Sequence, residues 1–346
     1  MPDGGIRLAE LTTLRVGGAA ARFVRATTAA ELVAAVSDAD AAQEPVLLVG
    51  GGSNLLVADD GFAGVVVQIA SDGLEVADDG DSVLVTVQAG MAWDDLVARA
   101  VAAGWSGIEA LSGIPGSVGA TPIQNVGAYG QEVATTIDEV EVWDRRLRGV
   151  RRFAGRECSF GYRHSRFKAD PSRFVVLAVT FRLVVEPLGQ PVRYAELGRR
   201  LGVEPGERAP LAAVRAAVLA LRAGKGMVLD PADHDTWSAG SFFTNPVLDS
   251  AAAARLPEDA PRYDQPDGTV KTSAAWLIEH AGFGKGFALT PAAPASLSTK
   301  HTLALTNRGA ARASDLLALA RQVRDGVETR FGVRLVNEPV LVNCSL

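Results

Sequence analysis

The sequence predicts a mixed α and β protein of two or three domains. A chain of 346 residues is too long for one ordinary hydrophobic core. Hydrophobic residues make up 48% and charged residues 21%, as in globular proteins. Short apolar runs typical of strands alternate with segments of helical periodicity.

The N-terminal half begins with a clear helix signal. Thr28 and Glu31 form a capping box, and Leu32 and Val36 follow on one helical face. Apolar or alternating runs predict strands at residues 45–49, 65–69, 83–88, 137–143 and 174–185, and apolar residues at helical spacing predict a helix at 92–103.

The C-terminal half contains a change in composition. Residues 186–210 carry proline, glycine and charge, which suggests an inter-domain region. Ser314 is expected to cap a long helix that places Leu316, Leu319, Val323 and Val327 in one apolar stripe, which indicates packing. The remaining predictions are helices at 211–221 and 271–282, a loop at 288–298 and a final strand at 333–336.

Composition excludes several classes of protein. The net charge of −6 argues against a general nucleic-acid binder, so an anionic substrate needs a local basic cluster. Cys158 and Cys344 lack metal spacing, which disfavours a disulfide framework or zinc site and fits a reducing compartment. Histidines at ligand spacing are also missing, so we expect no metal. Without a signal peptide or an apolar run of about twenty residues, we expect a cytoplasmic protein with no membrane span.

The most informative segment is residues 105–130, WSGIEALSGIPGSVGATPIQNVGAYG. It has six glycines, and residues 110–130 contain no acid, base or histidine. Glycine lets a backbone approach a ligand closely, and backbone N–H groups can hold a pyrophosphate without a lysine. The segment therefore suits a large, polar-edged cofactor. The alternative is a set of surface turns, but such turns are usually rich in Asp and Ser.

Four segments together carry a family resemblance. They are GGGSN at 50–54, SGIPGSVGATPIQNVGAYG at 112–130, CSFGYRHSRFK at 158–168 and SAGSFFTNP at 238–246. GGGSN alone is weak, and neither glycine motif has the Rossmann spacing. In this order the segments closely resemble the UDP-N-acetylenolpyruvoylglucosamine reductase family, over about residues 14–338.

The resemblance implies a fold and a reaction. The fold is α+β, with a two-subdomain FAD-binding domain of the vanillyl-alcohol-oxidase (PCMH) type and an α+β C-terminal substrate-binding domain. The implied boundaries are 1–65, 66–209 and 210–346. NADPH would reduce non-covalent FAD, and flavin N5 would pass a hydride to the enolpyruvyl ether of UDP-N-acetylglucosamine, giving UDP-N-acetylmuramate for peptidoglycan synthesis. We expect a monomer.

The resemblance also assigns the FAD contacts. These residues lie in or next to the two glycine-rich segments, apart from one arginine further along the chain. They are Gly50, Gly51, Gly52, Ser53, Asn54, Leu55, Ile114, Pro115, Gly116, Ser117, Gly119, Ala120, Gln124, Asn125, Gly127, Ala128, Tyr129 and Arg163.

Three residues match the family's catalytic positions. Arg163 would stabilise the enolate-like charge that follows hydride transfer, because its fork suits a carboxylate. Ser241 would protonate C2 as a fixed neutral donor. Glu338 would orient groups or protonate around the enolate, although its surroundings, Leu335-Val-Asn-Glu338-Pro, depart from the common form. The alternatives are a surface arginine, a turn-capping serine and a solvated carboxylate.

Substrate binding falls to a polar and basic set. Tyr194 matches the tyrosine that one of the two family types places over the substrate, and Lys225 is the candidate for the diphosphate. The alternative for each lysine is a solvated surface charge. The other matches are Asn245, Tyr263, Lys271, Lys300 and His301.

Two other functions remain open at this point. One is a flavin-dependent oxidase of the same fold, although residues 50–54 carry no histidine for covalent attachment of the flavin. The other is a flavin- or nucleotide-binding protein without catalysis, which the joint presence of Arg163, Ser241 and Glu338 argues against.

Overall fold

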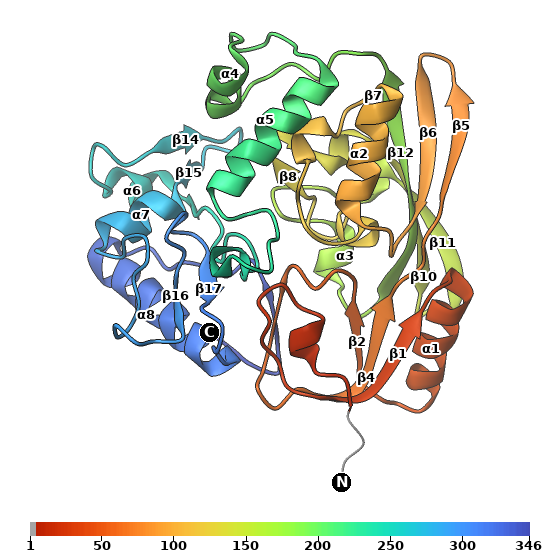
Figure 1. Cartoon of the computed structure of the whole chain (residues 1–346), viewed down its shortest axis with the longest axis horizontal. Helices are drawn as coiled ribbons and strands as arrows, with labels where there is room; N and C mark the ends of the chain where they lie inside the picture. The colour runs from red at the N-terminus through yellow and green to blue at the C-terminus, as the bar shows by residue number, and fades with distance from the viewer. Residues whose placement is uncertain (1–4) are drawn as a thin grey trace. The chain divides into compact units, whose positions relative to one another are not determined.

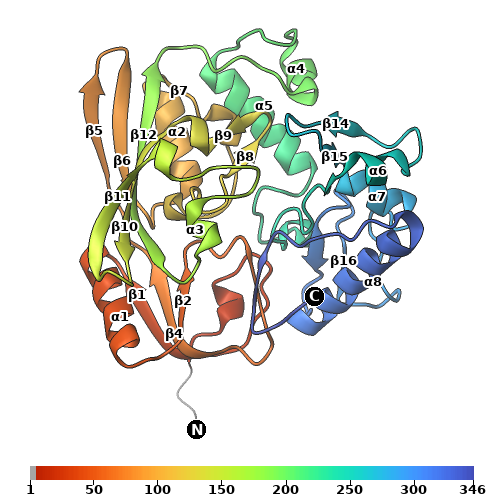
Figure 2. The same cartoon turned by 180° about the vertical axis from the view of Figure 1, so that it is seen from behind.

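A computed structural model describes residues 5–346 (Figures 1 and 2), so the first four residues of the predicted 1–65 subdomain lie outside the described part. The chain forms two compact units that interleave along the sequence. Unit 1 contains the described part of residues 1–20 together with Gly52–Phe62 and Lys225–Leu346. Unit 2 contains Ala21–Gly51 and Ala63–Gly224. The three predicted domains stay a prediction.

Unit 2 begins with a small sheet covered by a helix. The strand order is β1-β4-β2, and β2 and β4 run parallel. The capping box is confirmed, because Thr28 Oγ1 accepts a hydrogen bond from the N–H of Glu31 at 3.1 Å. Leu32 and Val36 are fully buried against the sheet. The elements are β1 (Ala20–Ala26), α1 (Ala29–Ala41), β2 (Val46–Val49) and β4 (Phe62–Ile69).

A larger antiparallel sheet forms the centre of unit 2 (Figure 2), with the order β11-β10-β12-β6-β5 and with β7 on β12. Helix α2 (Trp93–Ala103) packs its apolar stripe, including Trp93 and Leu96, into the core of this sheet. The strands are β5 (Leu74–Asp79), β6 (Ser82–Gln88), β7 (Trp105–Ser106), β10 (Ile137–Asp144), β11 (Gly149–Ala154) and β12 (Phe174–Val185). The predicted strands and helix of this unit are therefore confirmed.

Helix α5 and several short elements complete unit 2. Helix α5 (Leu211–Gly224) lies beside α2 in Figure 1, and residues of the two helices are in contact. The composition change at 186–210 coincides with α4 (Ala195–Leu201), and all of it lies inside unit 2. The others are η2 (Glu109–Leu111), η3 (Val118–Ala120), β8 (Gly127–Ala128), β9 (Gln131–Glu132), η4 (Val133–Thr135), η5 (Gly155–Glu157) and α3 (Arg166–Ala169).

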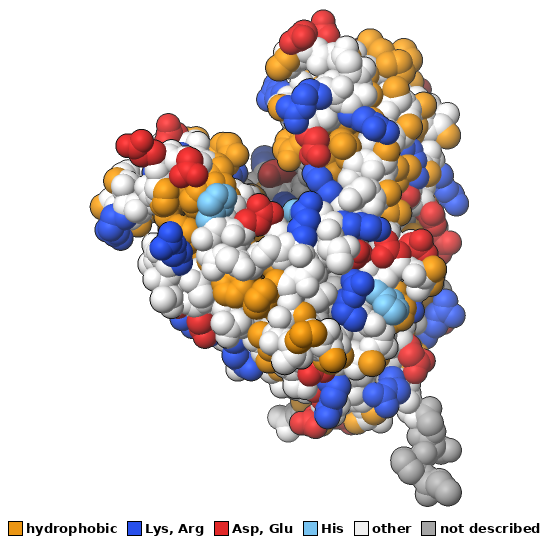
Figure 3. Space-filling view, turned by 60° about the vertical axis from the view of Figure 1, so that its left-hand side comes forward, with side chains coloured by type: hydrophobic (Ala, Val, Ile, Leu, Met, Phe, Trp, Pro, Cys, Tyr) orange, Lys and Arg blue, Asp and Glu red, His pale blue; other side chains and the backbone are white. Residues whose placement is uncertain are grey.

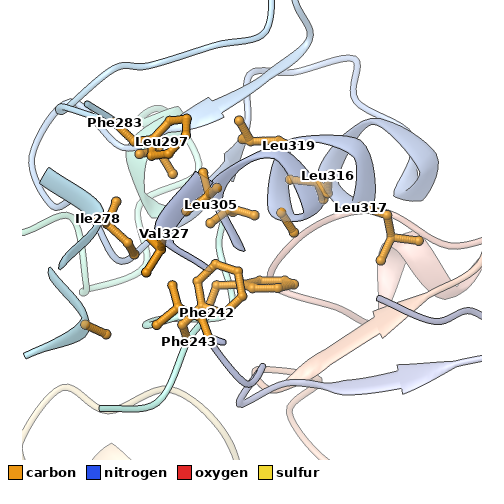
Figure 4. Close-up of a cluster of buried hydrophobic side chains, with 14 of the residues drawn as sticks. Phe242, Phe243, Ile278, Phe283, Leu297, Leu305, Leu316, Leu317, Leu319 and Val327 are labelled. Atoms are coloured by element: carbon orange, nitrogen blue, oxygen red, sulfur yellow. The ribbon is translucent and has the colours of Figure 1, made fainter. Parts of the chain in front are cut away.

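Unit 1 is built around its longest helix, α8 (Ala313–Phe331). Figure 4 shows Leu316, Leu319 and Val327 of this helix together with Phe242 and Phe243. All five side chains are at most 1% exposed, so the predicted packing role of the stripe is confirmed. The two phenylalanines anchor the segment that carries Ser241.

The remaining elements of unit 1 are short. Three small sheets have the orders β13-β15-β14, β16-β17 and β18-β3, the last of them parallel. The elements are η1 (Leu8–Glu10), β3 (Leu55–Val57), η6 (His234–Thr236), β13 (Val247–Leu248), α6 (Ser250–Ala254), β14 (Arg262–Asp264), β15 (Val270–Thr272), α7 (Ala274–His280), β16 (Ala295–Leu297), β17 (Leu305–Asn307) and β18 (Val340–Val342).

Three local predictions for unit 1 are wrong, and a fourth, the helix at 271–282, is confirmed except at its ends. The helix predicted from residue 271 begins at Ala274, because residues 270–272 pair as β15. The predicted loop 288–298 contains β16, which pairs with β17. The predicted strand 333–336 is not a strand, and the last strand is β18. Arg312, not Ser314, is the N-cap of α8, since its N–H bonds Asp315 Oδ2 at 2.8 Å.

Acidic and basic side chains are mixed on the face shown in Figure 3. Within the described chain, no helix is both long and apolar enough to cross a membrane.

Candidate functional site

The 112–130 segment is fixed to unit 2 through its backbone. Gly116 O accepts from Trp93 N–H at 3.0 Å, and the N–H groups of Val118 and Gly119 donate to Met91 O and Ala89 O at 2.9 and 2.8 Å. The segment therefore lies along the chain that leads into α2. These bonds leave the glycine-rich backbone in one conformation, as a preformed cofactor site requires.

Close backbone approach explains two of its glycines. A Cβ on Gly51 would lie 2.7 Å from Gly116 Cα, and a Cβ on Gly119 would lie 2.5 Å from Ala89 Cβ. These positions admit no side chain without movement of backbone. The structure thus brings Gly51, from the first glycine-rich segment, against Gly116, from the second, as the resemblance implies.

Tyr129 lies at the tip of a tight hairpin. Strands β8 and β9 pair Ala128 with Gln131, which leaves Tyr129 and Gly130 as the two turn residues. Their φ angles are 50° and 86°, as a two-residue turn of type I′ requires. The left-handed region is unfavourable for tyrosine, so the surrounding contacts hold this residue in place. Its ring meets that of Tyr194 edge-on, with centroids 5.3 Å apart.

Asn125 is a buried connector behind this hairpin. It is 1% exposed and has a φ of 46°. Its Nδ2 donates to Glu132 Oε2 at 2.8 Å and to Gly161 O at 3.1 Å, and its Oδ1 accepts from Ala134 N–H at 3.1 Å. Asn125 therefore joins the glycine-rich loop to the turn that carries Arg163.

Arg163 lies in a four-residue turn closed by two backbone hydrogen bonds of 3.1 Å between Gly161 and His164. Its φ is 51°, so Arg163 is left-handed like Tyr129 and Asn125. Its guanidinium reaches back to the glycine-rich loop, where Nη2 donates to Gly127 O at 2.9 Å and Nη1 to Asn125 O at 3.4 Å. The predicted catalytic arginine and the predicted cofactor loop are therefore in contact.

Carboxylates next to the neutral loop hold it, and the sequence motifs did not point to them. Asp94 Oδ1 accepts from Gly113 N–H at 2.6 Å while its carboxylate binds Arg215 of α5 at 2.6 and 2.8 Å. Burial opposes ionisation of Asp94, but the bonds from Arg215 and Gly113 outweigh it and keep its pKa below the ordinary value. Glu109 and Glu132 are the first charged residues on either side of the neutral stretch. That position in the sequence was the one feature that could have indicated their role in holding the loop.

The first glycine-rich segment continues into unit 1. Gly52 has a φ of 60°, and a Cβ there would lie 1.8 Å from Leu11 O, so only glycine fits. Asn54 Nδ2 donates to Glu338 O at 3.4 Å, and Asn54 O accepts from Val340 N–H at 2.9 Å. A predicted cofactor residue thus touches the backbone of a predicted catalytic one.

Ser241 and Glu338 lie on adjacent backbone segments of unit 1. Glu338 N–H donates to Phe242 O at 2.8 Å, and Thr244 N–H donates to Val336 O at 3.0 Å. Gly240, directly before Ser241, has a φ of 72°. Both side chains are half-buried. The fold therefore brings together two of the three predicted catalytic residues from distant parts of the chain.

Three predicted substrate residues lie around one small sheet of unit 1. Tyr263 on β14 lies directly opposite Lys271 on β15, so their side chains share a face. Asn245 Oδ1 accepts from Ala274 N–H at 3.0 Å, at the start of α7. Asn245 leads into β13, whose Val247 is the partner of Lys271 on the other side.

Lys300 is held by acidic neighbours. Its Nζ forms an ion pair with Asp233, which raises the pKa of Lys300 and lowers that of Asp233. Next to it, Asp235 accepts from Thr299 N–H at 2.9 Å and from Arg308 Nη1 at 2.9 Å. The segment that carries Lys300, a predicted substrate residue, is therefore held by two aspartates.

Lys225 adjoins a glycine that is packed against Asp235. It precedes Gly226, where a Cβ would lie 2.9 Å from Asp235 O.

Among the described residues, no group of three or more His, Cys, Asp or Glu residues could hold a metal ion. The other predicted cofactor residues lie within the two segments already described or, for Leu55, directly after the first; they are Gly50, Ser53, Leu55, Ile114, Pro115, Ser117, Ala120, Gln124 and Ala128.

Comparison with protein families gives two matches. Residues 20–146 match the family described as "FAD binding domain". Residues 230–342 match the "UDP-N-acetylenolpyruvoylglucosamine reductase, C-terminal domain". The first range includes both glycine-rich segments, and the second includes Ser241 and Glu338.

Curated relatives match over nearly the whole chain. Proteins named UDP-N-acetylenolpyruvoylglucosamine reductase are 58% identical in Cutibacterium acnes, over 99% of this chain and 90% of the relative, and 58% identical in Salinispora arenicola, over 100% and 97%. A solved structure of the reductase from Thermus caldophilus is 28% identical, with a TM-score of 0.67 and 97% of each chain covered. The predicted α+β fold, with an FAD domain of the PCMH type before a C-terminal domain, is confirmed. The chain belongs to the UDP-N-acetylenolpyruvoylglucosamine reductase family.

Proposed function

We propose that Arg163, Ser241 and Glu338 carry out the reaction of this family in the present chain. The enzyme is an FAD-dependent oxidoreductase of peptidoglycan precursor synthesis that reduces the enolpyruvyl ether of UDP-N-acetylglucosamine. The FAD contacts would come from the two glycine-rich segments, whose neutral backbone and close glycine packing suit a large polar-edged cofactor. Bound FAD, once reduced by NADPH, supplies a hydride to the terminal methylene carbon of the substrate.

Arg163 stabilises the charge that follows hydride transfer. Negative charge develops at C2 and on the substrate carboxylate, and a guanidinium presents five N–H donors in a planar fork. Because Arg163 already bonds Gly127 O and Asn125 O, its side chain is positioned before substrate binds. A donor fixed in advance stabilises developing charge without reorganisation at the moment of reaction.

Ser241 donates the proton to C2, and Glu338 assists it. The observation that carries this assignment is the pairing of their backbones, since Glu338 N–H donates to Phe242 O directly after Ser241. The buried Phe242 and Phe243 anchor the serine segment. A neutral hydroxyl is a weak acid, so a positioned acidic neighbour that orients the donor supports the role.

The substrate is held by Tyr194, Lys225, Asn245, Tyr263, Lys271 and Lys300. The shared face of Tyr263 and Lys271 supports their joint use, because an aromatic ring and a cation side by side suit a sugar nucleotide. Cys158 and Cys344 are free thiols, which fits the proposed cytoplasmic location. A monomeric state is part of the same proposal.

The visible spectrum of the purified protein tests the reaction class. We expect flavin absorbance that NADPH bleaches without oxygen and that the enolpyruvyl substrate restores. Bound flavin that NADPH does not bleach would contradict the reductase assignment, and reoxidation only by oxygen would favour an oxidase.

Ser241→Ala tests the proton donor. We expect NADPH to bleach the flavin at the normal rate, while turnover falls about a hundredfold or more, as for loss of a general acid. Thr244→Val is the matched control, because it removes an exposed hydroxyl three residues along the same segment. Wild-type turnover in Ser241→Ala would show that another group supplies the proton.

A further inference from the structure

The candidate for a further role is Glu109, a buried carboxylate next to the cofactor loop. It is 1% exposed and lies in η2, just before the neutral stretch. Its three hydrogen-bond donors are neutral: Gly107 N–H at 2.7 Å, Gln131 Nε2 at 2.7 Å and Gln190 N–H at 2.6 Å. Burying a carboxylate is costly unless it is fully hydrogen-bonded, so the position calls for a physical reason.

The three donors come from different segments of unit 2. Gln131 belongs to the Tyr129 hairpin, which is β8, β9 and their turn. Its side chain also accepts from Ala110 N–H at 2.8 Å, so it closes a ring with Glu109. Gln190 belongs to residues 186–210, here called the Tyr194 arm. A single atom, Glu109 Oε1, therefore accepts one hydrogen bond from the hairpin and one from the arm.

The two ends of the Tyr194 arm are hydrogen-bonded to each other next to Glu109. Gly189 N–H donates to Ala209 O at 2.8 Å, and Val192 N–H and Glu207 O form another bond of 2.8 Å. A Cβ on Gly189 would lie 2.8 Å from Glu109 Oε1, so the backbone is pressed against the carboxylate. Tyr194 follows four residues after Gln190 and meets Tyr129 of the hairpin.

We infer that Glu109 is a positioning residue, which sets the distance between the Tyr194 arm and the Tyr129 hairpin and thereby the fit of substrate under Tyr194. A carboxylate suits this task because it accepts several N–H bonds and donates none. The inference rests on the proposed role of Tyr194 in substrate binding.

Glu109→Gln tests the inference at nearly constant size. The amide can accept with one oxygen only, so a buried N–H loses its acceptor. We expect the KM for the enolpyruvyl substrate to rise about tenfold, the size of one buried unsatisfied donor, with kcat within about twofold. Glu157→Gln is the control, because its carboxylate accepts Ala154 N–H at 2.9 Å on an exposed turn.

The Tyr194→Ala background separates positioning from general loosening. There we expect Glu109→Gln to change KM by less than about twofold, because residues in one network are not additive. An equal rise of KM in both backgrounds, or an unchanged KM in the single variant, would overturn the inference.

Gly189→Ala is a second variant in case Glu109→Gln loses flavin or does not fold. It displaces the arm from Glu109 Oε1 but leaves the bonds of Gly107 and Gln131 in place. We expect the same rise of KM with FAD retained. A normal KM with the arm displaced would contradict the inference.

Hydrogen exchange distinguishes failure of this inference from failure of the proposed function. Without substrate or NADPH, Glu109→Gln should speed exchange of the amides in residues 188–196 relative to wild type and to Glu157→Gln. Faster exchange in a protein that never reduces the substrate would refute the function and retain the positioning role. Unchanged exchange in a Glu109→Gln enzyme that still reduces the substrate would refute the positioning role and retain the proposed function.

Discussion

Two loops that carry predicted ligand contacts are held in opposite ways. In unit 2, the 112–130 loop is neutral, and Asp94, next to it in space, accepts its backbone N–H. In unit 1, residues 298–301 carry Lys300, which is paired with Asp233. The first loop would offer fixed backbone to its predicted ligand, whereas the second would offer a cation that is already partly neutralised. Binding at the 112–130 loop should therefore depend on how closely the backbone fits the ligand. Binding at Lys300 should depend on whether the ligand replaces Asp233 as the partner of the lysine.

The largest effect should come from Arg163→Lys. Lysine carries the charge but lacks the fork that holds Gly127 O and Asn125 O. We expect kcat to fall by about a hundredfold or more, as when a fixed charge-stabilising donor is lost. Arg166→Lys is the control, since its guanidinium lies over the Phe153 ring, 4.4 Å from the centroid. Unchanged steady-state turnover in Arg163→Lys would remove the assigned role.

Gly51→Ala should break the packing of the two glycine-rich segments. Its Cβ would lie 2.7 Å from Gly116 Cα, and backbone cannot move away cheaply. Overpacking costs about 1–3 kcal/mol, so FAD affinity should fall by about tenfold to a hundredfold. The comparison is Gly149→Ala, where the nearest atom would be 3.9 Å away. Fluorescence titration with FAD gives both affinities, and equal values would show that the contact is not needed.

Asp94 should make the neutral loop sensitive to acid. Its folded pKa is lowered, so its stabilising contribution is present above the unfolded value of about 4 and is lost as pH falls from there through the lower folded pKa. Asp94→Asn should lower the free energy of unfolding at pH 7 by about 1 kcal/mol, after allowance for its partial exposure. Urea titrations at pH 7 and pH 3 measure this against Asp95→Asn, the exposed neighbour. A mutant with the full acid dependence of wild type would refute it.

Lys300→Met should have the smallest effect. The bond that Lys300 Nζ donates to Asp233 raises the pKa of Lys300, so the lysine stays charged at neutral pH but is partly neutralised. Half-exposed ion pairs are worth up to about 1 kcal/mol, so KM for the nucleotide sugar should rise about threefold. Lys285→Met, at an exposed lysine, should leave KM unchanged. A Lys300→Met enzyme with normal KM would mean that Lys300 stabilises its own loop through Asp233 and does not bind the substrate.

Local signals predicted secondary structure well where the pattern was long. Helices α1, α2, α5 and α8 and the strands of the large sheet lie where periodicity placed them, because a buried face leaves a repeated pattern. Apart from the N-cap of α8, the errors fall in short elements of unit 1. Strands β15 and β16 have three residues each, too few for a periodic pattern, and pairing with the neighbouring strands β14 and β17 decides them.

The sequence by itself determined the family, and with it the cofactor and the reaction, because four motifs in order carry that information. Only the tertiary structure decided which groups support the site. The bond between Glu338 N–H and Phe242 O, the contact of Arg163 with Gly127 O and the three donors of Glu109 all join segments that are separate in the chain. Motifs record which side chains are present, whereas hydrogen-bond partners across a fold depend on how the backbone brings them together.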